Sequence, residues 1–535
     1  MLPVVILAAC TEEVLPPSTR TDPDDVPFTY TEVPLTPFVN PLVGTAGPGH
    51  AIPGALVPHG MVRASPDTHG DESSVTAYRY EETLLDGFSH THLEGAGGSD
   101  YGYSQILLLP QAGELVVDAD ERVASFDHAT ESARPGYYAV TAGGVRAELT
   151  ATSHAAVHRY TFPPGPARVL IDVGSSLGAS IGGALANEGD VVTGYGEYVV
   201  HPLASAWFAD LGDTGRTTVY TAITVSVPPT THGTFQDGEG AAEGADTVTG
   251  AWSGGWVGWE FATETTVEVR VGVSYLSVEQ ARANLDAEVG DAEFDTVAAR
   301  ADAAWNHVLN RVQIDGTDDE KRLFYTALYR SVFQPSDHTE AGGRYAVLTR
   351  GEAVVRDDGL RYMTDDWCQW DTFRTVHPLG TLIEPELRDD VARSALLVYE
   401  QGGWLDKCPW SATGYARVMI GTPTVPILTD MLRKGLDRFD TDLAWEAIDK
   451  AGTQEVEGVA YGLCGYSSLG TPPEYVSLGF VPYACDPAQS ASLTLEHAVD
   501  DAAAARFAAA IGRDPDAARY AARAGNWRNT FDTTV

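Results

Sequence analysis

The spacing of the hydrophobic residues changes once along the chain, close to residue 276, and this change divides the expected fold into two halves. In the first half, hydrophobic residues share one parity along short runs, as in Val219, Ile223, Val225 and Val227 and again in Val267, Val269, Val271 and Val273. Such runs, broken by Gly, Pro and Asp clusters, are typical of antiparallel strands buried on one face. Because no clear helical pattern interrupts them, we predict an antiparallel β-sandwich domain over residues 38–276.

After residue 276 the spacing becomes helical. Ser277 and Gln280 have the spacing of a capping box that opens a helix. The hydrophobic residues that follow step by three and four: Phe294, Val297, Ala301, Trp305, Val308 and Val312. We therefore predict linking helices over residues 277–317. Later helices are expected at 318–332, 388–400, 424–434, 440–450, 490–511 and 515–530. Helices joined by long loops over 318–535 indicate a toroid or solenoid of helices.

The last predicted helix has an apolar face and ends close to the last residue of the chain. That face consists of Ala517, Tyr520, Ala521, Ala524, Trp527 and Phe531. Since little chain follows to cover it, we expect the helical half to continue beyond Val535.

The first residues indicate export. Met1–Ala9 is apolar but far too short to span a bilayer, which needs about 20 residues. It resembles the end of a secretory signal, and Leu7–Cys10 resembles a bacterial lipobox, in which Cys10 would be lipidated. Residues 11–37 are rich in Pro, Thr and acidic residues and read as a disordered tether. The alternative is an apolar start with no such role.

The charge balance excludes one class of partner. The chain has 34 Lys and Arg against 75 Asp and Glu, a net charge of −41. Such a field repels phosphate backbones, so we expect no nucleic-acid partner. It also repels anionic lipid surfaces, so we expect membrane contact only through a lipid at Cys10. The charge is not a sign of disorder, because 44% of the residues are hydrophobic, enough for large packed cores.

Four cysteines remain once Cys10 is set aside. They are Cys368, Cys408, Cys464 and Cys485. In an oxidising compartment they allow one or two disulfides, while their spacings match no zinc pattern. Buried free thiols are the alternative.

Two motifs in the first half have several interpretations. His90 and His92 lie two residues apart, and on a strand both rings would face one side, as in a metal site; they equally suit polar residues that shape a pocket. Gly174–Gly178 matches the Gly-x-Ser-x-Gly elbow of serine hydrolases, with Ser176 as the nucleophile. The elbow requires a helix immediately afterwards, and residues 179–189 show none.

The second half contains residues of the types that bind sugars. Trp370, Asp371 and Arg374 combine a ring face for sugar C–H groups with charged groups for adjacent hydroxyls. Trp404 lies on a loop between helices and suits either a ligand contact or a core anchor. The alternative for the first three residues is an ordinary helix start with a salt bridge.

A glutamate near the start of the 490–511 helix has the context of a general acid. Leu495, Val499, Ala503 and Phe507 are expected to form the buried face of this helix, with Glu496 beside it. Partial burial would raise the pKa of Glu496, and Asp500 one turn away would raise it further. A solvated acidic helix start is the alternative.

Short sequence blocks occur in a fixed order from residue 38 onwards. They are Val39–Thr45, Pro53–Ala55, Pro58–Val62, Ser65–Thr68, Gly87–His92, Pro135–Tyr138, Ser274–Ala281, Phe324–Tyr329, Trp370–Arg374, Gln401–Leu405, Lys434–Gly435 and Thr494–Glu496. In this order they resemble glycoside hydrolase family 92, the calcium-dependent exo-α-mannosidases of bacteria.

The resemblance implies a fold and a reaction. The fold is an N-terminal β-sandwich, linking helices and a C-terminal (α/α)6 barrel, of which residues 318–535 would be the N-terminal part. The reaction is an inverting release of terminal α-linked mannose from glycans, with α-1,2 linkages favoured. A Ca²⁺ ion would hold the 2- and 3-hydroxyls of that mannose through hard oxygen ligands. Its ligands in this chain are not identified.

The resemblance also implies roles for individual residues. By motif, Glu496 is the expected general acid, and Asp371 and Arg374, with Trp370, are expected contacts to the terminal mannose. The other residues expected around the pocket are Gly44, Thr45, His90, His92 and Trp404.

The chain departs from the family pattern in two ways. Family members are longer and carry a Gly-Asn-Glu-Pro-like block and a later acidic block, which supply most of the calcium site and the general base; neither block is present. Thr422 also stands where the family often has an acidic or amide residue. Our leading hypothesis is an exported exo-α-mannosidase, represented by an incomplete chain. A non-catalytic mannoside-binding surface lipoprotein and a Ser176 esterase are the alternatives.

Overall fold

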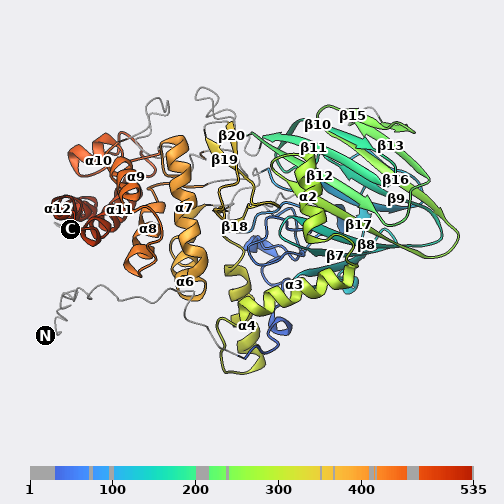
Figure 1. Cartoon of the computed structure of the whole chain (residues 1–535), viewed down its shortest axis with the longest axis horizontal. Helices are drawn as coiled ribbons and strands as arrows, with labels where there is room; N and C mark the ends of the chain where they lie inside the picture. The colour runs from blue at the N-terminus through green and yellow to red at the C-terminus, as the bar shows by residue number, and fades with distance from the viewer. Residues whose placement is uncertain are drawn as a thin grey trace.

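The computed structural model of the chain describes residues 31–70, 76–95, 102–199, 216–236, 240–349, 352–365, 368–408, 415, 419–454 and 469–532. An antiparallel β domain is followed by a helical domain, as the change of hydrophobic spacing predicts. Figure 1 shows the strands at one end of the molecule and helices α6 to α12 at the other, with α3 and α4 below the junction.

The β domain contains two antiparallel sheets. One has the order β1-β2-β3-β9-β16-β13-β14, with β4 paired to β2, and the other the order β15-β10-β11-β12-β17-β8-β7-β6-β5. The strands of the first sheet are β1 (Ser65–Thr68), β2 (Leu84–Ser89), β3 (Leu107–Ala112), β4 (Ala124–Ser125), β9 (Gly165–Asp172), β13 (Thr231–Gln236), β14 (Gly240–Glu243) and β16 (Ser253–Phe261). Those of the second are β5 (Ser132–Arg134), β6 (Tyr137–Ala142), β7 (Val145–Ala151), β8 (Ala155–Phe162), β10 (Ala179–Asn187), β11 (Val191–Val199), β12 (Arg216–Val225), β15 (Thr247–Thr249) and β17 (Thr265–Ser274).

Hydrophobic side chains from both sheets meet in one core. Alternate residues of β17, from Val267 to Val273, are fully buried, as period-two spacing predicts. Strand β12 pairs with β17 so that Ile223 lies opposite Val271, and both are buried. Burial of alternate hydrophobic side chains therefore stabilises the sandwich, and this alternation is the pattern from which the sandwich was predicted.

Three helices connect the β domain to the rest: α2 (Val278–Glu288), α3 (Phe294–Leu309) and α4 (Asp318–Ser331). Helix α2 approaches β17 closely at Gly272, where a Cβ atom would collide with the carbonyl oxygen of Ala281. Only half of the predicted capping box forms at Ser277. Its hydroxyl accepts from the Gln280 N–H (3.1 Å), but the Gln280 side-chain oxygen accepts from Arg344 Nη1 (3.1 Å) instead of from the Ser277 N–H.

The helical domain follows the predicted order with additions. Its helices are α5 (Gln369–Thr372), α6 (Val376–Ile383), α7 (Pro385–Gly402), α8 (Thr424–Arg433), α9 (Thr441–Thr453), α10 (Pro473–Leu478), α11 (Ser490–Ala510) and α12 (Asp514–Arg523). Two small strand pairs precede them: β18 (Ser336–Asp337) with β21 (Met363–Thr364), and β19 (Tyr345–Thr349) with β20 (Glu352–Arg356). The predicted 515–530 helix is split, because α12 ends at Arg523 and a 3-10 turn continues to Thr530.

Part of the predicted 11–37 tether is packed. Leu35 is buried, and its N–H donates to the side chain of Asn306 on α3. The N–H of Val33 donates to the side chain of Asn310, directly after α3. Residues 1–30, including Cys10, lie outside the described residues. Among the described helices, none combines the length and the apolar character needed to cross a membrane. The domain boundaries at 276 and 317 remain predictions.

Candidate functional site

Two sequence-predicted residues, 122 positions apart, meet in the helical domain. Arg374 follows α5, and Glu496 lies in the second turn of α11. The Arg374 Nη2 donates to Glu496 Oε1 at 3.1 Å. The guanidinium also lies over the ring of Trp370, 4.5 Å from its centroid. The fold therefore brings Trp370, Arg374 and Glu496 together from distant parts of the sequence.

Glu496 is a partly buried carboxylate. Its side chain is 15% exposed, whereas that of Arg374 is 45% exposed. Burial raises the pKa of Glu496, while the Arg374 charge and its hydrogen bond act in the opposite direction. The indole N–H of Trp370 also lowers this pKa, although it is not aligned for a hydrogen bond within the described residues. The result is a carboxyl that holds its proton to a higher pH than an exposed glutamate.

Glycine at position 421 makes room for this carboxylate. Its φ of +71° lies in the left-handed region, and a Cβ atom there would come within 2.7 Å of Glu496 Cγ and 2.8 Å of Asp500 Oδ2. The next residue, Thr422, donates its backbone N–H to Asp500 Oδ2 at 2.7 Å. The Gly421–Thr422 turn therefore fits against both acidic side chains at once.

Two titratable side chains, Asp500 and His497, lie within about one turn of Glu496 on α11. Burial raises the pKa of Asp500 to about 8, with the Glu496 and Asp501 charges adding to the shift. Burial, with Lys407 and Arg523 nearby, lowers the pKa of His497 to about 3, so that its ring is neutral. Asp500 thus holds its proton to a higher pH than an exposed aspartate does.

The buried face of α11 differs from the prediction in its first half. Leu495 and Val499 are 39% and 46% exposed, whereas Ala503 and Phe507 are buried as expected. The face actually buried there carries Leu493, His497 and Asp501, and Tyr475 of α10 donates to Asp501 at 2.8 Å. The prediction was wrong because it followed hydrophobicity, while a polar group with a partner can occupy a buried position.

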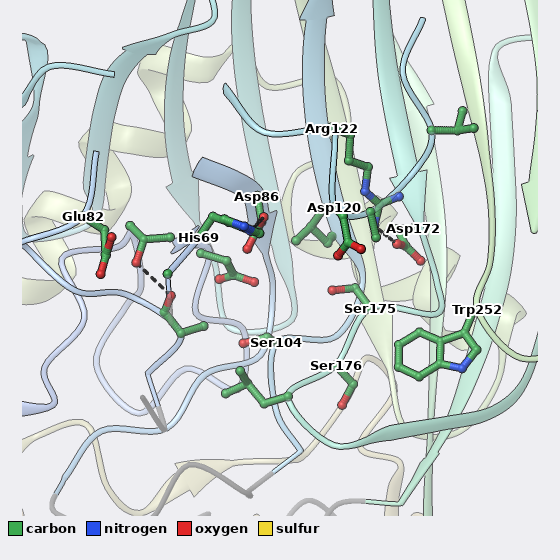
Figure 2. Close-up of a pocket in the computed structure, with 18 of the residues that line it drawn as sticks. His69, Glu82, Asp86, Ser104, Asp120, Arg122, Asp172, Ser175, Ser176 and Trp252 are labelled. Atoms are coloured by element: carbon green, nitrogen blue, oxygen red, sulfur yellow. Dashed lines mark hydrogen bonds and ion pairs between the residues drawn. The ribbon is translucent and has the colours of Figure 1, made fainter. Parts of the chain in front are cut away.

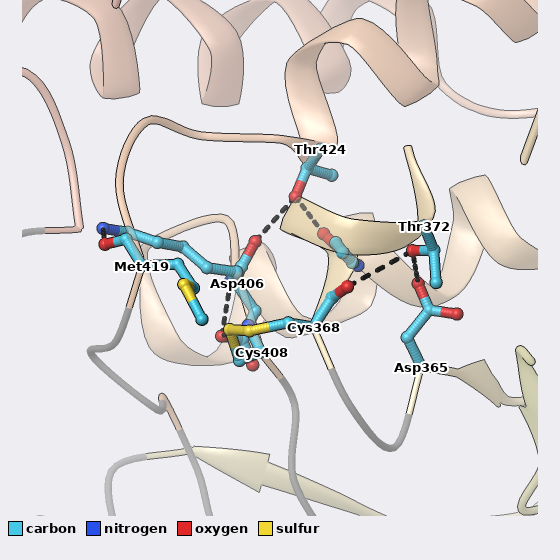
Figure 3. Close-up of a disulfide and its surroundings, with 9 residues drawn as sticks. Asp365, Cys368, Thr372, Asp406, Cys408, Met419 and Thr424 are labelled. Atoms are coloured by element: carbon cyan, nitrogen blue, oxygen red, sulfur yellow. Dashed lines mark hydrogen bonds between the residues drawn. A yellow bond between two sulfur atoms is a disulfide. The ribbon is translucent and has the colours of Figure 1, made fainter. Parts of the chain in front are cut away.

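A disulfide holds the start of α5. Cys368 precedes α5 and is bonded to Cys408 in the loop after α7, which confirms one of the pairings that the sequence allowed. Figure 3 shows this bond beside Asp406 and Thr424, whose hydroxyl donates to Asp406 O at 2.7 Å. Cys464 lies outside the described residues. The disulfide thus anchors the segment that carries Trp370 to Arg374.

The site lies where the two domains meet. Trp370 packs on a buried cluster that combines Leu93 and Tyr103 from the β domain with the Cys368–Cys408 disulfide. Asp371 is exposed beside Trp370. The indole is therefore packed on one side, and charged groups lie on the other.

Neither histidine of the 90–92 motif offers a ring nitrogen to a ligand. The His90 ring bonds to Ile106 O (2.6 Å) and to His158 (3.0 Å). The His92 ring bonds to Arg63 O and to Asp67 Oδ1, both at 2.7 Å. Both side chains are buried and have different partners, so the two rings do not converge as metal ligands would.

The remaining predicted residues have distinct places. Gly44 is exposed in a left-handed turn, and the buried Thr45 hydroxyl donates to Leu42 O at 2.9 Å. Trp404 is 6% exposed and belongs to a core cluster, with the Lys450 ammonium 4.7 Å from its ring centroid, so it is a core anchor. Ser176 lies between β9 and β10, and no helix follows it as a nucleophile elbow requires.

Some buried charged residues around α5 and α11 carry little signal in the sequence. Lys407 is almost fully buried and donates to Met419 O at 3.1 Å; its only signal is that the chain has few lysines. Asp365 accepts from Thr372 (2.9 Å) and His377 (2.8 Å) beneath α5. The sequence spacing of Asp365, Thr372 and His377 does not predict these hydrogen bonds.

The described residues do not supply a metal site. Within those ranges, no three or more His, Cys, Asp or Glu side chains are grouped so that they could hold a metal ion. We therefore derive no step through calcium from these side chains.

Sequence and structure comparisons agree on the family. The glycosyl hydrolase family 92 N-terminal domain matches residues 38–274 and the family 92 catalytic domain matches residues 280–535. A β domain joined to helices that carry an Arg–Glu pair beside a tryptophan is thus the frame of a glycoside hydrolase. The chain belongs to glycosyl hydrolase family 92.

Solved relatives share the fold over most of the chain. A family 92 α-mannosidase and a family 92 inverting mannosidase, both from Bacteroides thetaiotaomicron, match with 26% and 30% identity and a TM-score of 0.82 each. Each match covers 94% of this chain and 66% of the relative. An uncharacterized secreted glycosidase from Arthroderma benhamiae is 26% identical over 92% of this chain and 62% of its own length. The chain thus spans slightly less than two thirds of these relatives.

Proposed function

We propose that the protein is an exo-α-mannosidase that releases terminal α-linked mannose from glycans, α-1,2-linked mannose first, with inversion and with the assistance of calcium. The observation that carries the proposal is the Arg374–Glu496 pair beside Trp370, at a domain junction, in a member of family 92. The printed names of the solved relatives support the substrate, since two are mannosidases and one is described in complex with mannoimidazole.

In this proposal Glu496 is the general acid. Its Oε1 accepts the hydrogen bond from Arg374, which leaves Oε2 to carry the proton. Because burial raises the pKa of Glu496, the carboxyl keeps this proton until it is transferred to the departing glycosidic oxygen. In an inverting hydrolysis a second carboxylate, about 6.5–9.5 Å from the first, activates a water molecule on the opposite face of the sugar. We assign that base to no described residue.

The sugar contacts follow from exposure. Asp371 and Arg374 are exposed and charged, so we propose that they bind hydroxyls of the terminal mannose, while the part of the Trp370 indole that Arg374 leaves uncovered contacts its C–H groups. We propose that Gly44 and Thr45 form part of the opposite wall. His90, His92 and Trp404 would support these walls from behind, since their side chains are buried against protein.

The location of the enzyme is part of the proposal. The Leu7–Cys10 pattern and the secreted relative support export, and we propose a lipid anchor at Cys10 in the bacterial cell envelope. Labelling with a radioactive fatty acid tests this: the wild type should incorporate label and Cys10→Ser should not. Equal incorporation in both would contradict the anchor.

Mannose release tests the reaction. The protein, expressed from its whole reading frame, should release mannose from α-1,2-mannobiose in calcium and lose this activity in EDTA, with recovery when calcium is added back. Proton NMR of the first product should show β-mannose, the inverted anomer. No release would contradict the activity, release unaffected by chelator would contradict the calcium assistance, and α-mannose as first product would contradict inversion.

A further inference from the structure

The β domain contains a cavity that the proposed reaction does not use. Its volume is about 430 Å³, and its walls come from β1, β2, β3, β9, β13 and the loops between them. Figure 2 shows Asp86 and Asp120 near its centre, with Ser175, Ser176 and Trp252 on one side. Neither Glu496 nor Arg374 lines it. We propose that this cavity is a second carbohydrate site, which binds one unit of a neutral sugar.

An exposed tryptophan is held rigidly at the cavity. Trp252 is 42% exposed, yet its φ of +57° is a conformation that bulky residues rarely adopt. The backbone N–H of Trp252 donates to Ser180 Oγ at 3.1 Å, and Gly174 leaves the space that the Trp252 Cα occupies. The fold therefore presents this indole on a fixed backbone, as a stacking surface for sugar C–H groups requires.

A buried hydroxyl at the cavity lacks a protein partner. Ser104 is 3% exposed and lines the cavity, and its Oγ has no hydrogen-bond partner among the described residues. In Figure 2 Ser104 lies among the other lining side chains, between Asp86 and Ser176. Since leaving a buried hydroxyl unpaired costs free energy, a ligand hydroxyl at this position would satisfy it.

The charges of the lining select the kind of ligand. Asp86 accepts from His69 at 2.9 Å, Asp172 forms an ion pair with Arg122, and Arg79 lies 4.0 Å from the Glu81 carboxylate, so the basic groups of the lining have acidic partners. Asp67 is bonded to His92, and the remaining carboxylates of Glu82 and Asp120 disfavour an anion. The described residues contain no group of three or more ligating side chains for a metal ion. Carboxylates and serine hydroxyls beside an indole instead match a neutral polyhydroxylated ligand.

The cavity adjoins the domain junction, because neighbouring residues of the chain contact the two. Tyr103 packs in the cluster that supports Trp370, and its neighbour Ser104 lines the cavity. Leu177 and Ser176, which also line it, bond to Tyr103 O at 2.8 and 3.4 Å. A sugar bound there would thus lie on the β-domain side of the junction, separate from the Glu496 carboxylate.

Calorimetry on a variant with the other site disabled tests the proposal. In the Arg374→Ala, Glu496→Gln background, methyl α-mannoside, methyl α-glucoside and methyl β-galactoside are titrated in turn. We expect at least one to bind, with its dissociation constant raised at least tenfold by Trp252→Ala and also raised by Asp120→Ala. Trp527→Ala is the matched control, because Trp527 is 41% exposed and lies outside this cavity; it should leave binding unchanged.

The outcomes separate this site from the proposed function. Binding lost in Trp252→Ala, with circular dichroism unchanged, supports the cavity whether or not the protein releases mannose. No binding of any of the three sugars to the background variant would overturn it, and so would binding that Trp252→Ala and Trp527→Ala weaken equally. Loss of mannose release in Glu496→Gln alone concerns the other site only.

Discussion

At the residue scale, Gly421 is the position where backbone conformation and the acidic pair depend on each other most closely. We predict that Gly421→Ala destabilises the protein by about 1–3 kcal/mol and lowers mannoside hydrolysis at least tenfold. The reasons are the left-handed φ, worth about 1–2 kcal/mol for an L-residue, and the displacement of Glu496 and Asp500 by the new methyl group. Urea unfolding and initial rates measure the two effects.

Gly342→Ala is the control for this substitution. Gly342 also has a positive φ, +83°, but a Cβ atom there would meet nothing within 4 Å. It should show the conformational cost alone and keep its activity. Equal losses of activity in both variants would show that Gly421 does not act through the acidic pair.

The raised pKa of Asp500 predicts how stability depends on pH. Since burial raises this pKa to about 8 from 3.8, the folded state binds a proton that the unfolded state has lost between these values. The contribution of Asp500 to stability is therefore complete below about pH 4 and declines as pH rises towards 8. Asp500→Asn resembles the protonated form, so it should match the wild type at pH 3 and be more stable at pH 9. A difference independent of pH would contradict the shift.

Arg374 sets the alkaline limit of activity in the proposed mechanism. Because the guanidinium lowers the pKa of Glu496, removing it should raise that pKa and move the alkaline limb of kcat/KM to higher pH, besides weakening substrate binding. We expect this movement in Arg374→Ala with α-1,2-mannobiose. Arg322→Ala, on the exposed surface of α4, should leave the limb in place. A limb that stays in place in Arg374→Ala would argue against this coupling.

Residue types were easier to predict than residue contacts. The combination of Trp370, Asp371, Arg374 and Glu496 was visible in the sequence, and the Arg374–Glu496 bond joins two of them. The roles of His90 and His92 could not be separated in advance, because the rings turn to different partners that come from distant strands and loops. A short polar motif shows which hydrogen-bonding groups are present, but the fold determines which of them remain available to a ligand.

At the element scale, the disulfide joins the residue before α5 to the loop after α7. It closes a loop of 40 residues, for which chain entropy predicts about 4 kcal/mol of stabilisation. We predict that replacing both Cys368 and Cys408 by Ser lowers the unfolding free energy by about 2–4 kcal/mol and weakens mannoside binding, because Trp370 and Arg374 lie on the tethered segment. Denaturant unfolding of the wild type and the variant, with and without reductant, measures the change in unfolding free energy. Identical curves for the variant and the oxidised wild type would contradict the role.

Element positions followed periodicity where the buried face is mainly apolar. Strand β17 and helix α8 lie where the spacing predicted them. The buried face of α11 did not, because Asp501 is buried with a hydrogen bond from Tyr475 and the His497 ring packs against the same tyrosine, which a single helix does not reveal. The split of the last helix at Arg523 has a similar origin, since the Arg523 side chain turns to Asp501 of α11. Hydrophobic spacing describes one element, and these features belong to pairs of elements.

At the scale of the whole molecule, the net charge of −41 must be carried by one folded chain. Repulsion among the acidic groups opposes the compact state and is screened by salt, whose Debye length falls from about 10 Å at 0.1 M to about 3 Å at 1 M. We predict that the melting temperature rises by a few degrees between 0.1 and 1 M NaCl. An equal rise in 1 M sucrose, which leaves charges unscreened, would assign the effect to general exclusion from the surface instead.

The junction of the two domains joins these scales, because Trp370 rests on β-domain residues while Glu496 belongs to α11. The central claim is that Glu496 donates a proton there. The most direct measurement compares Glu496→Gln with the wild type on α-1,2-mannobiose and on 2,4-dinitrophenyl α-mannoside, whose leaving group needs no proton. We predict a loss of about 10³-fold on the disaccharide and a far smaller loss on the aryl mannoside. Equal losses on both substrates, or no loss on either, would contradict the claim.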